Sequence, residues 1–141
     1  MTSYETTTDI AAPVEQVWSI LTDAAAYPSW NSTIISMEGV IGDGETISLV
    51  STINPKRTFR LTVSGIEAPS SMVWSDGMPL GLFSGVRTFS VVPTEDGGST
   101  FSMVERYSGL LAPLITKSIP DMSDSFDAFA ADLKVAAESA A

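Results

Sequence analysis

The chain has 141 residues, of which 44% are hydrophobic, and this length and composition predict one globular domain over residues 1–141 and exclude a disordered chain. A net charge of −10, from 17 acidic and 7 basic residues, disfavours nucleic acid and anionic membranes as partners. The sequence has no cysteine and no histidine, which excludes disulfide bonds, thiolate and imidazole catalysis and His-containing metal sites, so we expect no metal and no cofactor.

The first third of the chain is predicted to form one strand and two short helices. Residues 3–10 are rich in threonine and other strand-forming residues, which favours a strand. Pro13 suits the first position of a helix, and apolar residues follow it at helical spacing, namely Val14, Val17, Trp18 and Leu21. Residues 24–27 predict another helical turn, which we expect Pro28 to end.

Between Ile34 and Tyr107, short apolar alternations are separated by turn residues such as Asn54-Pro55. Because the connections are short, neighbouring strands should run antiparallel. Together with the first strand they make a sheet of about seven strands. The strands predicted here cover residues 33–41, 45–54, 57–67, 71–76, 85–93 and 100–107.

The last third of the chain predicts a long amphipathic helix. One helical face carries Met122, Phe126, Phe129, Ala130 and Leu133. Acidic residues occupy other faces, and we interpret Asp121, Asp124 and Asp127 as a solvated surface rather than a metal site. Pro113 and Pro120 leave two alternatives for the start of the helix, a separate short turn over 112–118 or a kink at Pro120.

The order of these elements predicts an α+β fold in which the long helix packs across a curved antiparallel sheet. A sheet must cover its apolar face, and only the C-terminal helix is long and apolar enough to do so. A bent sheet and a helix cannot match along their whole length, so we expect a gap at one end. That gap is the predicted ligand cavity.

The last two predicted strands place charged side chains on the faces that carry their large apolar residues. On the first of them, alternation puts Arg87 on the face of Phe89. On the second, it puts Glu105 on the face of Met103 and Tyr107. The apolar members mark both faces as inward, so Arg87 and Glu105 should point toward the cavity.

The loop between these two strands sets how the charges pair. A three-residue loop over 96–98 pairs Glu95 with Ser99. This register puts Arg87 and Glu105 on a diagonal, within reach of each other. We therefore predict a buried Arg87–Glu105 ion pair that lines the cavity.

Three interpretations of this pair, with the Tyr107 hydroxyl nearby, stay open. The pair can fix the strand register and do nothing else, or it can orient a ligand through the planar fork of Arg87. It can also support acid–base catalysis in which Glu105 exchanges protons. An apolar pocket raises the pKa of Glu105 and an arginine partner lowers it, so distance and burial decide between these effects.

Other side chains are predicted to line the cavity, with plain core packing as the alternative for each aromatic one. The full predicted lining is Trp30, Trp74, Phe83, Arg87, Phe89, Met103, Glu105, Tyr107, Leu110, Leu114, Phe126 and Phe129. The apolar, glycine-rich segment 77–85 is predicted to be a lid over the cavity mouth, facing Leu110 and Leu114. The alternative is a surface loop that packs on its own core or against a second copy in a homodimer.

Taken in order, several motifs resemble the START-like (SRPBCC) superfamily, in particular its polyketide cyclase/dehydrase-like branch. The residues that carry the resemblance are Ile10 to Trp18, Tyr27 to Asn31, Val73-Trp74-Ser75, Arg87-Thr88-Phe89, Glu105 to Leu114, and the helix that contains Phe126 and Leu133. The resemblance implies a helix-grip fold with an internal hydrophobic cavity for lipids, sterols, polyketides or similar ligands. It implies no single reaction, and no catalytic residue is carried over from it.

Our leading hypothesis is a protein that binds a small, mainly apolar ligand between the sheet and the C-terminal helix, with Arg87, Glu105 and Tyr107 as polar contacts. An alternative is a cyclase- or dehydratase-like enzyme in which the same three residues act on a polyketide-like or aromatic substrate, so whether the protein is an enzyme stays open. A third is a cochaperone-like interaction module that uses the apolar loop. Without a signal-peptide pattern or an apolar run of about 20 residues, we expect a cytoplasmic protein with no stable membrane insertion.

Overall fold

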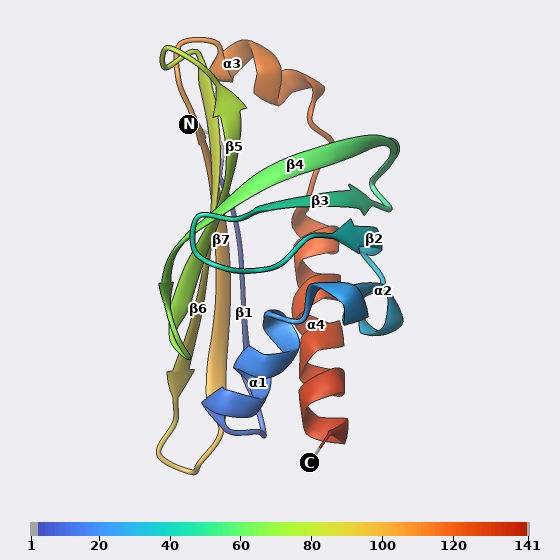
Figure 1. Ribbon diagram of the computed structural model, residues 1–141, viewed down its shortest axis with the longest axis vertical. Coiled ribbons are helices and arrows are strands. Elements are labelled where there is room, and N and C mark those ends of the chain that lie inside the picture. The colour runs from blue at the N-terminus through green and yellow to red at the C-terminus, as the bar shows by residue number, and fades with distance from the viewer. Residues whose placement is uncertain (1–2, 141) are drawn as a thin grey trace.

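A curled antiparallel sheet forms one side of the molecule in the computed structural model, which describes residues 3–140 (Figure 1). Over these residues the sheet has seven strands in the order β1-β7-β6-β5-β4-β3-β2. Every neighbouring pair is antiparallel, so the predicted meander is confirmed. The strands are β1 (Ser3–Ile10), β2 (Ile34–Glu38), β3 (Thr46–Ser51), β4 (Asn54–Glu67), β5 (Ser71–Met78), β6 (Phe83–Pro93) and β7 (Ser99–Ser108).

The helices lie on one side of this sheet, with the long C-terminal helix running beside it (Figure 1). None of the helices within residues 3–140 combines the length and the apolar character needed to cross a membrane. The helical elements are α1 (Val14–Leu21), η1 (Ala24–Ala26), α2 (Tyr27–Trp30), α3 (Ala112–Ile115), η2 (Thr116–Ser118) and α4 (Ser123–Ser139).

Pro28 and Pro55 lie at positions that differ from the predicted ones, and Pro120 decides between the two predicted alternatives. Pro28 lies in the first turn of α2 and does not end a helix, because a first-turn position needs no N–H donor. Pro120 precedes the start of α4, so the alternative with a separate turn over residues 112–118 is the one observed. Asn54-Pro55 belongs to β4 rather than to a turn. Pro55 lies where the register between β3 and β4 shifts. The strand ladder is interrupted there, so a residue without a backbone N–H donor is tolerated.

The hairpin that joins β6 and β7 has a longer loop than predicted. Pro93 pairs with Ser99, so residues 94–98 form the loop. The Thr94 carbonyl accepts a hydrogen bond from the Gly97 N–H at 3.2 Å, which closes a turn in this loop. Gly97 has a left-handed φ of 87°. The register is therefore two residues away from the predicted one. A shift of two keeps every side chain on its predicted face, because the strand period is two.

The core lies between the sheet and α4, and an aromatic cluster fills its centre. Phe129 of α4 is 1% exposed and lies about 6 Å, centroid to centroid, from Phe89, Phe101 and Tyr27. Polar contacts hold α4 to the N-terminal strand, since the Thr6 hydroxyl donates to Asp127 at 3.0 Å. From Ala130 to Ala137 the inward side chains of α4 are buried, and open space is left nearer its N-terminal end.

Candidate functional site

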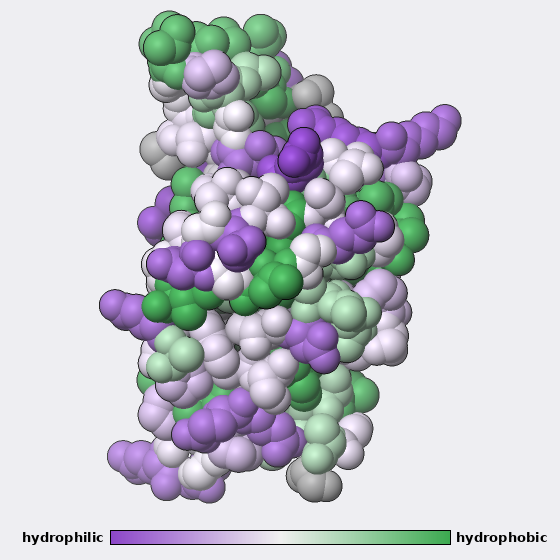
Figure 2. Space-filling model, in the orientation of Figure 1, coloured by the Kyte–Doolittle hydropathy of each residue, from purple (hydrophilic) through white to green (hydrophobic). Residues whose placement is uncertain are grey.

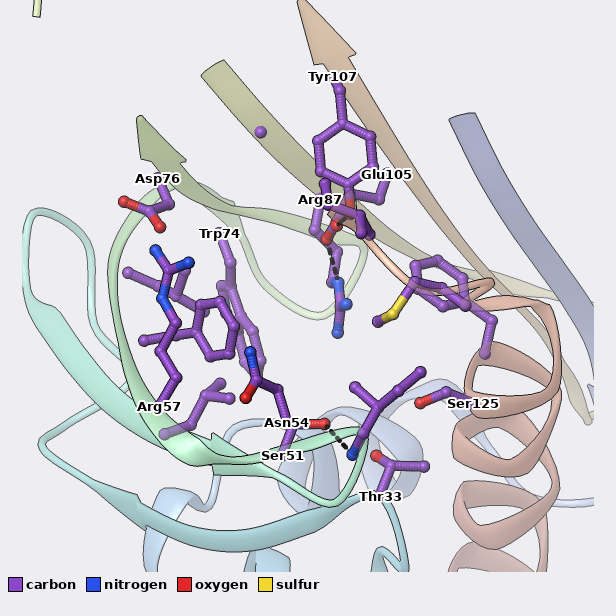
Figure 3. Close-up of a pocket in the computed structure, with 18 of the residues that line it drawn as sticks. Thr33, Ser51, Asn54, Arg57, Trp74, Asp76, Arg87, Glu105, Tyr107 and Ser125 are labelled. Atoms are coloured by element: carbon purple, nitrogen blue, oxygen red, sulfur yellow. Dashed lines mark hydrogen bonds and ion pairs between the residues drawn. The ribbon is translucent and has the colours of Figure 1, made fainter. Parts of the chain in front are cut away.

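A cavity of about 330 Å³ lies between the sheet and the N-terminal part of α4 (Figure 3). Its size is at the lower end of the range for ligand pockets, roughly 300–1,000 Å³. Strands β2 to β7 form one wall, and the segment from α3 to α4 forms the other. Most of the lining is apolar, with Leu49, Phe59, Leu61, Trp74, Met103, Ile115, Ile119, Met122, Phe126 and Phe129 among its members.

Strand alternation brings the charged side chains into this cavity. Arg87 of β6 and Glu105 of β7 face each other directly in the antiparallel ladder. Tyr107 follows two residues later on the same face of β7 and also lines the cavity. The two charges therefore meet as an opposed pair, not on the diagonal that the shorter loop implied.

The three polar side chains form one hydrogen-bonded group. Arg87 Nε donates to Glu105 Oε1 at 2.8 Å, and the Tyr107 hydroxyl donates to Glu105 Oε2. The Arg87 and Glu105 side chains are each 15% exposed. The Arg87 guanidinium also lies over the Phe126 ring, 4.8 Å from its centroid. These contacts fix the plane of the guanidinium at the end of an apolar chamber.

One edge of the Arg87 guanidinium remains available to a ligand. Its contacts within the described chain use Nε and the face of the group, and neither Nη atom has a hydrogen-bond partner there. Figure 3 shows the guanidinium pointing into the open centre of the cavity. The pair thus presents hydrogen-bond donors to whatever occupies the space, while its own charge is balanced by Glu105.

The surroundings of Glu105 keep it ionised. Burial by itself would raise the pKa of this carboxyl group, but the Arg87 charge and the hydrogen bonds from Tyr107 and Arg87 together lower it below its ordinary value. The pKa of the Tyr107 phenol is raised, first by burial and then by the Glu105 charge. At neutral pH the group is therefore a carboxylate, a guanidinium and a neutral phenol.

A second set of charges stands at the mouth of the cavity. The guanidinium of Arg57 on β4 lies 4.7 Å from the Phe59 ring centroid and points toward Asp76 of β5 (Figure 3). β4 pairs with β5 only from Thr62 onward, where Thr62 lies opposite Ser75, whereas the earlier part of β4 pairs with β3 alone. Arg57 and Asp76 therefore lie on opposite sides of the point where β4 and β5 separate.

Arg57 and Asp76 are not among the lining residues predicted from the sequence, although strand alternation carries a signal for them. Alternation along β4 places Arg57 on the face of Phe59 and Leu61, two apolar residues that line the cavity. Asp76 follows Trp74 by two residues in the same way. Their approach to each other depends on where β4 leaves β5, and local patterns do not show that.

Eight of the twelve predicted lining residues are in the cavity wall. They are Trp74, Phe83, Arg87, Met103, Glu105, Tyr107, Phe126 and Phe129. Trp30 and Phe89 lie outside it, because both pack in the aromatic core around Phe129. Leu110 and Leu114 also lie outside it and are 82% and 68% exposed, since the segment after β7 turns its leucines outward and lines the wall with Ile115 and Ile119 instead.

The predicted lid is mostly regular strand. Met78 pairs with Phe83, so only residues 79–82 form a turn within the segment 77–85. The remaining residues of this segment continue β5 and β6, and several of them form part of the cavity wall. An independent flap over the mouth is therefore not observed.

Comparisons with known proteins agree with this architecture. A family model described as "Polyketide cyclase / dehydrase and lipid transport" matches residues 1–138. A START superfamily protein from Mycobacterium smegmatis superposes with a TM-score of 0.73 at 18% identity, covering 99% of both chains. A protein from Rhodobacter sphaeroides gives 0.74 at 23% identity, covering 97% of this chain and 92% of the other. A hypothetical protein from Helicobacter pylori gives 0.76 at 13% identity, covering 95% and 86%. No curated protein matches the sequence.

Proposed function

The chain belongs to the polyketide cyclase/dehydrase and lipid transport family and has its START-like, hydrophobic-ligand-binding fold, and from that premise we propose that it binds a small, mainly apolar molecule whose hydrogen-bond acceptor meets Arg87. The ligand lies in the cavity between the sheet and α4. Its apolar body contacts aromatic and aliphatic walls such as Trp74, Met103 and Phe126.

The observation that carries this proposal is the free Nη edge of Arg87 in an apolar chamber. A ligand that enters the cavity displaces water from these donors, so it must supply an acceptor in return. Glu105 already balances the charge of Arg87, so a neutral acceptor leaves no unpaired charge in the cavity. Ketone, ester, amide and quinone oxygens have this chemistry.

The same geometry gives less support to acid–base catalysis by Glu105. Both carboxylate oxygens accept hydrogen bonds, one from Arg87 and one from Tyr107. The lowered pKa of Glu105 also makes it a weak base at neutral pH. Binding is therefore the function that these contacts favour.

The test compares ligands of one shape that differ only in the acceptor. One such pair is 2-acetylnaphthalene, which has a carbonyl acceptor, and 2-ethylnaphthalene, which has none. In calorimetric titration we expect the carbonyl member of each pair to bind more tightly. A hydrogen bond to a charged donor corresponds to roughly tenfold or more in affinity. In Arg87→Met this preference should disappear.

Two further variants control the interpretation. Arg106→Met removes an exposed arginine from the neighbouring position of β7 and should keep the preference. Ser125→Phe places a ring in the cavity wall and should weaken both members of each pair. Equal binding of carbonyl and hydrocarbon ligands to the wild type, or no binding by any pair, would contradict the proposal.

A further inference from the structure

One end of the molecule exposes large apolar side chains. The β5–β6 turn contributes Met78 and Leu80, which are 48% and 94% exposed, and the segment after β7 contributes Leu110 and Leu114, at 82% and 68%. Figure 2 shows apolar residues gathered at this end, which corresponds to the β5–β6 turn and α3 in Figure 1. We call residues 77–85 and 108–120 the apolar tip.

Backbone contacts hold the two parts of the tip together. The Leu110 N–H donates to the Gly81 carbonyl at 3.1 Å, and the Leu111 N–H donates to the Leu82 carbonyl at 2.7 Å. The leucines are thus held outward by a hydrogen-bonded scaffold. Leu80 adds a second unfavourable feature, since its φ of 63° is left-handed, a conformation that costs a residue with a β-carbon free energy. Folding of the isolated chain gains nothing from this exposed and strained leucine.

The tip also differs in charge from the rest of the protein. The chain has 17 acidic residues, but neither 77–85 nor 108–120 contains one. The exposed Lys117 is the charged residue of these two segments. A surface that lacks carboxylates can approach a lipid interface without desolvating them, whereas the acidic remainder of the molecule repels anionic lipids. The charge pattern therefore suits a zwitterionic bilayer.

The four exposed side chains would not by themselves make a stable contact with a second copy of the chain. The four exposed side chains offer roughly 200–350 Å² of apolar surface at about 60–120 Å² for a whole side chain. A stable protein interface buries about 800 Å² of total surface on each partner, so a dimer would need contacts well beyond these four side chains. Side chains that project from a narrow end fit between lipid headgroups, where no matching surface is required.

The tip adjoins the wall of the cavity. Met78 and Phe83 belong to the tip and also line the cavity, as does Ile115 of α3. A molecule that leaves a bilayer at this point therefore reaches the cavity along apolar side chains.

We propose that the apolar tip docks reversibly on the surface of a zwitterionic phospholipid bilayer, with Leu80, Leu110 and Leu114 entering the interface and the adjoining wall of the cavity close to it. Docking depends only on the tip and goes beyond the ligand proposal. It crosses no membrane and needs no anionic lipid.

Vesicle flotation with phosphatidylcholine vesicles and the full chain tests this docking. We expect the wild type to float with the vesicles and to do so at least as well in about 1 M NaCl, because screening does not weaken an apolar contact. The triple variant Leu80→Ser, Leu110→Ser, Leu114→Ser should lose about tenfold or more of the partitioning. These side chains are exposed, so the variant should keep the wild-type melting temperature.

A matched control removes exposed apolar side chains outside the tip. The variant Val40→Ser, Val92→Ser, Val135→Ser replaces residues that are 67%, 54% and 65% exposed, and it should float like the wild type. Ser125→Phe should also float normally, so a failed ligand proposal does not decide the docking result.

Several results would overturn the proposal. One is the absence of flotation by the wild type, and another is undiminished flotation of the Leu80/Leu110/Leu114 variant. Binding only to phosphatidylglycerol vesicles that is lost in high salt would show electrostatic attachment instead. A dimer in light scattering that the same triple variant abolishes would identify a second copy as the partner of the tip.

Discussion

Replacing Arg87 by methionine leaves the Glu105 carboxylate in the cavity wall without its cation. Loss of one partner costs about 3–5 kcal/mol for a fully buried ion pair and about 0–1 kcal/mol for an exposed one. The Arg87 and Glu105 side chains are each 15% exposed, and the Tyr107 hydrogen bond to Glu105 remains in the variant. We therefore expect a loss of about 2–3 kcal/mol at neutral pH, nearer to the buried case.

This loss should appear as a lower melting temperature in circular dichroism. A domain of this size loses about 3–4 °C per kcal/mol, so Arg87→Met should melt about 6–12 °C below the wild type. Arg106→Met, at an exposed position of β7, should change the melting temperature by less than about 2 °C.

The pH dependence follows from the lowered pKa of Glu105. Its value in the folded protein is below the ordinary 4.5, so the ionised group stabilises the fold fully above that pH. This contribution is lost as the pH falls from 4.5 through the lower folded value. The gap in melting temperature between wild type and Arg87→Met should therefore narrow under these acidic conditions. A gap that is constant with pH, or no larger than that of Arg106→Met, would refute the reasoning.

Two further predictions concern the packing around the cavity and the scaffold of the tip. Phe129→Ala removes the centre of the aromatic cluster and should cost about 3–5 kcal/mol in urea unfolding, whereas Val135→Ala on the exposed face of α4 should cost less than about 1 kcal/mol. Gly109→Ala puts a β-carbon 2.7 Å from a main-chain oxygen at a φ of 111°, and should cost about 2–3 kcal/mol. Gly81→Ala, at a φ of 69° with no atom within 4 Å, should cost about 1 kcal/mol. Comparable losses in the two members of either comparison would contradict these explanations.

The faces of the strands were predictable because alternation is a local property. Arg87 and Glu105 were assigned inward from their apolar neighbours, and the two-residue error in register did not change that assignment. The loop length itself was not predictable, since Thr94 and Gly97 form a turn that competes with the shorter hairpin. The position of Arg57 at the mouth was not predictable either. Alternation shows that its side chain faces inward, but it does not show where β4 separates from β5.

The sequence alone determined the order of the elements, the helix that covers the sheet and the residues that each strand turns inward. These features depend on periods of two or 3.6 residues, which act over a few positions. Tertiary structure decided the cavity, the two charges at its mouth and the leucines at the tip. Each of these arises where β4 leaves β5, where α4 stops following the sheet or where the segment after β7 meets the β5–β6 turn, and that geometry depends on how separate elements pack against one another.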